Sequence, residues 1–297
     1  MITRRTVLAS LAATLAAPAL ASPKTPSGIM ELAYSDHSPR NMLDIYRPEG
    51  PGPFPAILDI HGGGFLTGDK RDLRVPRQVL DRGIAVVRMN YRLSSQSRWP
   101  AQQDDVLSAA AFLQKHGKDL GLVTDRIALG GRSAGAFLAV SAAISMVQAG
   151  WSPAAVVNFY GPMDFGSMDA DMARLDLKVT RPPADSAQSV ESLLVGYAVG
   201  DRRKEATAMG PVGRLAMMAE GVRLPPLMIR HGIRDNIVSA HQAEHLRTAW
   251  HRVDPLTPID FQLLPDEGHG TAAFGGDKVL GDLASFLARY LVPVMSG

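Results

Sequence analysis

Short apolar runs and stretches of helical periodicity follow one another along most of the chain. Runs rich in branched and aromatic residues predict strands at 42–46, 54–60, 83–91, 126–130, 154–160, 226–230 and 259–264. Apolar residues three to four positions apart predict helices at 73–82, after Trp99-Pro100, and at 136–146, 240–251 and 276–291. Such alternation requires crossover connections, so we expect an α/β fold with a mostly parallel central sheet and helices on both faces.

One segment breaks this regular alternation. Residues 164–222 mix short helical and loop signals, and nothing in the middle of the chain has the composition of a linker. Folds of the α/β class commonly run to about 250 residues or more as one domain. We therefore expect a single domain over residues 22–297. Residues 164–222, called the cap below, are expected to be an insertion that could form a small lid.

The first 21 residues have the pattern of an export signal. Arg4 and Arg5 precede an uncharged apolar run over 7–17, and small residues at 19 and 21 form a cleavage pattern. The run is shorter than the roughly 20 residues that a membrane-spanning helix needs. We expect cleavage after Ala21 and a periplasmic or extracellular protein, with the paired arginines favouring the twin-arginine pathway over the general secretory route.

Cysteine content and charge exclude several classes of protein. The chain has no cysteine, which excludes disulfides, thiolate metal sites and a cysteine nucleophile. Its formal charge is +2, and removal of Arg4 and Arg5 with the signal would leave it neutral. This balance gives no electrostatic attraction to nucleic acid or to a membrane surface, so we expect neither as a partner. The oligomeric state is left open.

The segment Gly131-Arg132-Ser133-Ala134-Gly135 lies between a predicted strand and a predicted helix. In a Gly-x-Ser-x-Gly elbow the serine occupies a strained turn from strand to helix, and small neighbours let the two elements approach closely. Such a turn would expose the hydroxyl of Ser133, which is our candidate nucleophile. Taken alone, the pattern fits an ordinary glycine-rich turn equally well, and three further groups at strand ends favour the elbow.

The segment His61-Gly62-Gly63-Gly64 directly follows a strand of buried type. Acyl transfer needs hydrogen-bond donors aimed at a developing oxyanion, and glycines let backbone amides approach without an intervening side chain. We assign the N–H groups of Gly63 and Gly64, together with that of Ala134, to an oxyanion hole. His61 is interpreted as a residue that fixes the loop.

Two later strand ends supply a candidate acid and a candidate base. Asp235 and His269 each follow a predicted strand, the histidine between two glycines. A carboxylate that holds an imidazole in the correct tautomer lets it take a proton from a serine. The chain order Ser133, Asp235, His269, with each residue at a strand end, predicts a catalytic triad. Asp266 and Glu267 remain alternatives for the acid, although they would have to fold back on the histidine.

Together these motifs resemble the α/β hydrolase fold, in the esterase branch with a His-Gly-Gly-Gly oxyanion loop that includes hormone-sensitive-lipase-like and BD-FAE-type carboxylesterases. The matching segments span most of the mature chain and are 61–65, 68–70, 90–93, 99–100 with Asp104, 126–127, 131–135, 231–232 with Asp235, and 268–269. The resemblance implies a serine hydrolase without a cofactor. Arg132 departs from it, because this position is more often acidic, aromatic or histidine, and the cap matches no family pattern.

A competing motif is His241-Gln242-Ala243-Glu244-His245, which matches the inverted zinc-protease signature with two histidines one helical turn apart. A catalytic zinc needs a third protein ligand. The only glutamate downstream is Glu267, which belongs to the loop of His269. We therefore interpret the two histidines as residues on the outer face of a helix and expect no metal site.

Several functions are consistent with these motifs. A carboxylic ester hydrolase that acts on small-molecule esters through an acyl-enzyme is the leading hypothesis. The alternatives are an amidase or peptidase with the same triad and a catalytically silent binding protein on the same fold. The 40 residues from Ser22 to His61 leave no room for a large N-terminal cap, and residues 164–222 are rich in charge. We therefore expect a shallow, open pocket and a preference for short acyl chains.

Overall fold

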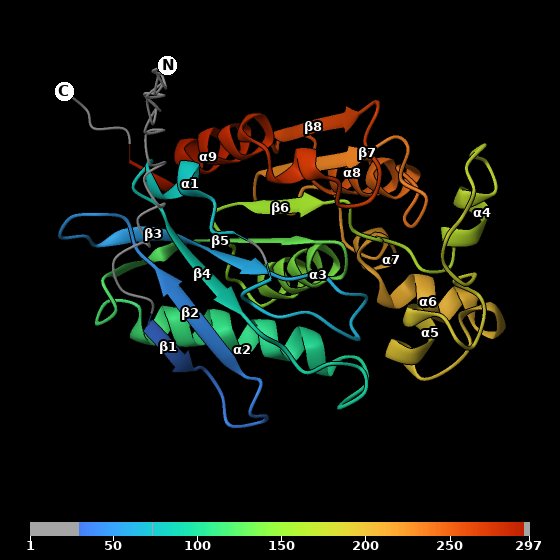
Figure 1. Cartoon of the computed structure of the whole chain (residues 1–297), viewed down its shortest axis with the longest axis horizontal. Coiled ribbons are helices and arrows are strands. Elements are labelled where there is room, and N and C mark those ends of the chain that lie inside the picture. Colours follow the sequence, from blue (N-terminus) through green and yellow to red (C-terminus); the bar gives the residue numbers. More distant parts are fainter. Residues whose placement is uncertain (1–29, 73, 294–297) are drawn as a thin grey trace, which may run out of the picture.

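The computed structural model describes residues 30–72 and 74–293 and has one large sheet between layers of helices (Figure 1). Eight strands form the sheet in the order β1-β2-β4-β3-β5-β6-β7-β8. Their bounds are Met30–Ala33 (β1), Met42–Tyr46 (β2), Phe54–Ile60 (β3), Ala85–Met89 (β4), Leu122–Arg132 (β5), Val156–Phe159 (β6), Leu227–Gly232 (β7) and Ile259–Leu264 (β8). The expected export signal at 1–21 and its cleavage point lie outside the described residues.

Strands β3 to β8 are parallel to one another. At one side of the sheet, β2 pairs antiparallel with β4, and β1 pairs antiparallel with β2. Parallel strands end at the same edge of a sheet, so the loops after β3, β5, β6, β7 and β8 come together there. In Figure 1 this is the edge toward which the arrowheads of β5 to β8 point, beside α4 to α7. The sheet therefore delivers every predicted site residue to one edge.

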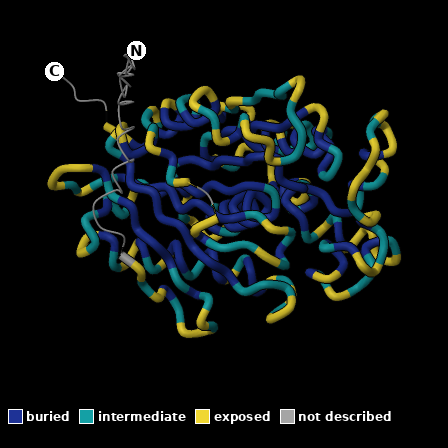
Figure 2. The backbone as a smooth tube through the Cα atoms, in the orientation of Figure 1, coloured by how far each residue is buried: buried dark blue, intermediate teal, exposed yellow. Residues whose placement is uncertain are grey.

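Helices cover both faces of the sheet. The main ones are α1 (Arg77–Leu80), α2 (Ala101–His116), α3 (Ala134–Gln148), α8 (His241–Val253) and α9 (Asp277–Leu291). One apolar cluster packs α2, α3 and α8 on the sheet, and a second packs α1 and α9 on the opposite face. Figure 2 shows the central strands buried along their length. Burial on both faces explains why these strands read as continuous apolar runs rather than as alternating ones.

The sequence predicted most of these elements. β2, β3 and β8 have the predicted bounds, whereas β5 begins four residues earlier than expected, at Leu122. The predicted helix 73–82 is wrong in extent, because only α1 is helical. Pro76 directly precedes α1, and a proline inside a helix would remove a hydrogen bond and clash with the preceding turn. The pattern did not predict β1, which is a short edge strand without a strand-like composition.

The cap consists of short helices joined by loops, on the side where the parallel strands end (Figure 1). They are α4 (Met168–Met172), α5 (Val190–Val195), the 3₁₀ helix η1 (Val199–Asp201), α6 (Arg203–Met209) and α7 (Pro211–Ala216). They lie between β6 and β7 in the chain. In the part of the chain that the structure describes, no helix is long and apolar enough to cross a membrane.

Candidate active site

Ser133 occupies the turn between β5 and α3. Its backbone angles are φ 52° and ψ −123°, a strained conformation for a residue with a side chain. The neighbouring glycines make the turn possible, because a Cβ at Gly131 would overlap the backbone of Gly135. A Cβ at Gly135 would in turn overlap the carbonyl oxygens of Ile60 and His61. The residues around Ser133 therefore build the elbow that the pattern predicts.

A line of hydrogen bonds joins Ser133, His269 and Asp235. The Nε2 atom of His269 lies 2.9 Å from Oγ of Ser133, and its Nδ1 atom lies 2.7 Å from Oδ2 of Asp235. A carboxylate only accepts hydrogen bonds, so Nδ1 carries the proton and Nε2 is left to accept the proton of the serine. The structure thus brings together three residues from three different strand ends.

The carboxylate of Asp235 is buried and hydrogen-bonded at both oxygens. Oδ1 accepts from the backbone amides of Ile237 and Val238, each at 2.9 Å. Oδ2 faces His269 and also lies 3.2 Å from Nε2 of His231. Burial alone would favour the neutral acid, but the hydrogen bonds from His231 and His269 hold the pKa of Asp235 well below its usual range. The group is therefore an anion at neutral pH.

The two alternative acids are engaged elsewhere. Asp266 is exposed, and the carboxylate of Glu267 accepts a hydrogen bond from the hydroxyl of Thr271. The backbone carbonyl of Glu267 accepts from the amide of Arg234 at 2.9 Å. This contact fastens the loop of the histidine to the loop of Asp235. Of the three carboxylates considered from the sequence, Asp235 is the one that the structure places on the imidazole.

The loop after β3 brings glycine amides to the serine. A Cβ at Gly62 would lie 3.3 Å from that of Ser133, so the loop passes beside the nucleophile. Gly63 and Gly64 have φ values of 105° and 58°, which strain residues with side chains. Within residues 30–72 and 74–293, no group accepts a hydrogen bond from the amides of Gly63, Gly64 or Ala134. Free donors beside a nucleophile are suited to bind an oxyanion.

His61 holds this loop from its buried side. Its ring stacks on Tyr91 with centroids 4.4 Å apart, and its Nδ1–H donates to the carbonyl of Gly62 at 2.7 Å. The hydroxyl of Tyr91 donates to the carbonyl of His61 at 3.2 Å. Burial lowers the pKa of His61, so the ring is neutral at pH 7. These are the contacts of a loop-fixing residue.

Arg132, the variable position of the elbow, forms a buried ion pair. Its guanidinium lies 2.9 Å from Oδ1 of Asp59, and that of Arg88 lies 3.2 Å from Oδ2. Burial would raise the pKa of Asp59, but the two guanidinium groups lower it below its ordinary value. Arg132 also lies over the ring of Phe159, 5.6 Å from its centroid. The departure from the family pattern thus ties the ends of β3, β4 and β5 together.

Sequence reasoning gave no role to two further residues at the site. Tyr160, directly after β6, packs edge-on against His269 with centroids 4.9 Å apart, and burial raises its pKa to about 12. His231, near the end of β7, lies with its Nε2 atom 2.9 Å from the carbonyl of Val238, beside Asp235. Both lie at strand ends next to the site, and that position is the signal that could have identified them.

The histidines of the zinc-like motif have other partners. Nδ1 of His241 lies 3.0 Å from the carboxylate of Glu244 on the same helix. Nε2 of His245 lies 3.0 Å from Asp171 in the cap. Among the described residues, no group of three or more His, Asp or Glu side chains could hold a metal ion. The two histidines therefore belong to helix and cap contacts.

The sheet order, the serine elbow and the loops at the carboxyl edge define an α/β hydrolase fold. The BD-FAE family model matches residues 43–250, and the chain belongs to that family. The structure is similar to a truncated carbohydrate esterase from gut microbiota, with a TM-score of 0.76, 22% identity, and coverage of 92% of this chain and 99% of that one. It is also similar to EstE1, a thermophilic carboxylesterase from a metagenomic library, with a TM-score of 0.72, 21% identity and 91% coverage of both. The predicted fold and family resemblance are confirmed.

Sequence relatives carry names of the same kind. The probable carboxylic ester hydrolase LipM of Mycobacterium tuberculosis is 27% identical over 84% of this chain and 57% of its own length. The ethyl acetate hydrolase of Pseudomonas putida is 36% identical over 32% of this chain and 31% of its own length. The chain therefore spans less than two thirds of the length of either relative.

Proposed function

We propose that the chain is a serine esterase that hydrolyses small carboxylic esters through Ser133, His269 and Asp235. The observation that carries this proposal is the unbroken line of hydrogen bonds from Asp235 through His269 to Ser133. The amides of Gly63 and Gly64, which have no acceptor among the described residues, lie on the loop beside the serine. Relatives named as ester hydrolases support the same chemistry.

The acylation step follows from this arrangement. The Oγ atom of Ser133 attacks the ester carbonyl while Nε2 of His269 takes its proton, and Asp235 stabilises the imidazolium that forms. The amides of Gly63, Gly64 and Ala134 would bind the negatively charged oxygen of the tetrahedral intermediate. When this intermediate collapses, the C–O bond to the alcohol breaks and the imidazolium gives its proton to the departing alcohol.

Deacylation repeats the same steps with water as the nucleophile. His269 takes a proton from the water, which attacks the acyl-enzyme, and then returns a proton to Oγ of Ser133 as the acid leaves. The edge contact with Tyr160 and the bond to Asp235 hold the imidazole for both steps. Every proton transfer in this proposal uses side chains of the chain itself.

We also propose that the acyl group is short. Val190 of the cap packs on the oxyanion loop, because a Cβ at Gly64 would lie 3.1 Å from its Cγ1 atom. Phe65, which directly follows Gly64, meets Phe137 edge-on with centroids 5.6 Å apart, and Phe137 stacks on Phe165 at 4.7 Å. This packing next to the oxyanion loop supports a shallow pocket, in which an acyl chain would have little apolar wall to bury against.

Replacement of the nucleophile tests the proposal. Ser133→Ala should lower kcat on p-nitrophenyl acetate at least about 10³-fold, because the attacking atom is gone. Its melting temperature should stay close to that of the wild type. An alanine variant that retains activity would overturn the assignment. Faster turnover of small peptide anilides than of esters would instead favour the amidase alternative.

A further inference from the structure

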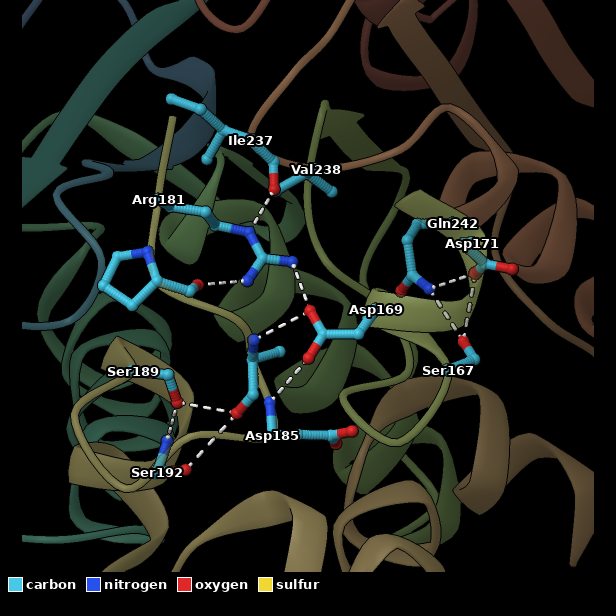
Figure 3. A network of polar contacts seen from close by, with 12 residues as sticks. Ser167, Asp169, Asp171, Arg181, Asp185, Ser189, Ser192, Ile237, Val238 and Gln242 are labelled. Carbon is cyan, nitrogen blue, oxygen red and sulfur yellow. Dashed lines mark hydrogen bonds and ion pairs between the residues drawn. The ribbon is translucent and has the colours of Figure 1, made fainter. Parts of the chain in front are cut away.

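A buried guanidinium joins the cap to the loop of the proposed acid. Nε of Arg181 donates to the carbonyl of Ile237 at 2.6 Å, and Nη1 donates to the carbonyl of Pro182 at 2.8 Å. Nη2 pairs with Asp169 at 3.3 Å, and the Arg181 side chain is only 10% exposed. Figure 3 shows Arg181 between Asp169 and the backbone of Ile237. The cap and the acid loop therefore share one charged contact.

Asp169 holds this guanidinium within a hydrogen-bonded frame. Its carboxylate also accepts from the backbone amides of Ala184 and Asp185, each at 2.8 Å. The carbonyl of Ala184 accepts from the hydroxyl of Ser189 at 2.7 Å, and the same hydroxyl caps the start of α5 (Figure 3). Arg181 is thus presented to the acid loop from a fixed part of the cap.

The carbonyl that Arg181 binds belongs to the peptide unit that holds the acid. The C=O of Ile237 and the N–H of Val238 lie in one planar unit and point in opposite directions. That N–H donates to Oδ1 of Asp235 at 2.9 Å. Arg181 and Asp235 therefore bind opposite edges of the same planar peptide unit. A charged donor on the carbonyl also polarises the N–H toward the carboxylate.

We propose that Arg181 is a positioning residue through which the cap holds Asp235 in line with His269 and Ser133. This inference rests on the proposed serine esterase. Without the guanidinium, the carbonyl of Ile237 loses its charged donor, and among the described residues the peptide unit is held only through its N–H to Asp235. A shift of about 1 Å at a catalytic group can lower the rate roughly 10²-fold, even when the altered residue lies away from the chemistry.

Arg181→Ala is compared with the wild type by kcat and KM on p-nitrophenyl acetate and by melting temperature. We expect kcat to fall about 10- to 100-fold with KM within about threefold, because the loss acts on the acid and not on substrate contacts. Arg203→Ala is the matched control, since Arg203 pairs with Asp185 of the same cap and its side chain is 60% exposed. Its kcat should stay within about twofold. Arg181→Lys keeps the positive charge but lacks the several N–H donors of the guanidinium, so its kcat should lie between those of the wild type and Arg181→Ala. It replaces the alanine variant if that variant does not fold.

A double-mutant cycle tests the route of the effect. In an Asp235→Ala background, Arg181→Ala should cost less than about threefold in kcat, because no carboxylate is left to position. Three outcomes would overturn the inference and show that Arg181 only stabilises the cap. They are a lower melting temperature of Arg181→Ala with unchanged kcat, an effect on KM alone, and effects of the two substitutions on kcat that are fully additive. If Asp235→Ala alone keeps the wild-type kcat, the proposed triad fails and this inference fails with it.

Discussion

Both oxygens of Asp235 are held by donors from different parts of the chain. Backbone amides of Ile237 and Val238 fix one oxygen, and the imidazoles of His231 and His269 meet the other. A carboxylate bound in this way cannot rotate freely, so it keeps the His269 ring in one tautomer. Asp235 therefore acts as much through the oxygen that accepts a hydrogen bond from Nδ1 of His269 as through its negative charge.

Asp235→Asn changes that acceptor while keeping the shape of the side chain. If the amide nitrogen faces His269, the ring must carry its proton on Nε2 and can no longer take the proton of Ser133. We expect kcat to fall by up to about 10⁴-fold with a small change in melting temperature. Steady-state kinetics on p-nitrophenyl acetate measures the loss.

Asp266→Asn and Glu267→Gln are the controls for this substitution. Asp266 is exposed and Glu267 bonds Thr271, so each variant should keep kcat within about threefold. The opposite pattern, with a large loss in either control and little effect of Asp235→Asn, would identify a different acid.

At the residue scale, the sequence predicted those site residues that have reactive side chains and directly follow a predicted strand. Ser133, Asp235 and His269 could be placed because each follows a strand, and parallel strands end at one edge. The ion pair of Asp59 with Arg132 could not be predicted, because no local sequence pattern links residues 73 positions apart. The contact of Arg181 with the acid loop was hidden for the same reason, since it starts in the irregular cap.

Among the elements, α8 anchors the cap through a polar network. Oε1 of Gln242 accepts from the amides of Met163 and Asp164, each at 2.8 Å. Its Nε2 atom donates to Asp171 at 2.7 Å (Figure 3). His245, one turn along α8, meets the same carboxylate. The carboxylate of Asp171 is buried, and that of Asp169 is only 27% exposed and accepts from backbone amides of the cap. These two carboxylates therefore help to hold the cap in place, whereas other charged side chains of the cap, such as Arg203, remain exposed.

The contact between His245 and Asp171 should make the stability of the cap depend on pH. Its hydrogen bond raises the pKa of His245 above the usual value of about 6.5; burial and Arg174 oppose the shift, and Asp164 adds to it. A raised folded-state pKa stabilises the fold fully below about pH 6.5, and the effect is lost as pH rises through that pKa. Burial opposes ionisation of Asp171, but hydrogen bonds from His245 and Gln242 lower its pKa, so the pair weakens only below about pH 4.

His245→Gln should therefore lower the melting temperature most at about pH 5 to 6. The expected difference is about 1–3 °C, because a half-exposed pair contributes at most about 1 kcal/mol after screening by solvent. The difference should shrink above about pH 8, which thermal unfolding at a series of pH values measures. His241→Gln is the matched control, since the partner of His241 lies on α8 itself. A difference in melting temperature between His245→Gln and the wild type that does not change with pH would contradict the ion pair.

At the scale of the whole molecule, strand and helix periodicity was sufficient to predict strands β2 to β8 and the layers of helices, but not the edge strand β1. Continuous apolar runs predict strands buried on both faces, and the crossover rule then leaves few arrangements. The cap was not predictable in this way. Its helices are only three to seven residues long and are held by side chains such as Asp169 and Gln242, whose partners lie 15 and 79 positions away in sequence. Periodicity cannot report such contacts.

Pocket depth is the property of the whole molecule that decides the substrate. Val190 packs on the oxyanion loop at Gly64, and the next residue, Phe65, packs against Phe137 and Phe165, which favours a shallow pocket. Each CH₂ of an acyl chain adds about 0.8 kcal/mol of binding only while apolar wall remains to cover it. We therefore expect kcat/KM on a ladder of p-nitrophenyl esters to peak at acetyl to butyryl and to fall steeply by octanoyl. Val190→Ala should move the peak by one or two carbons at most, because the aromatic rings remain. A maximum at decanoyl or longer, or activation on emulsions, would show that the cap opens into a deep acyl tunnel.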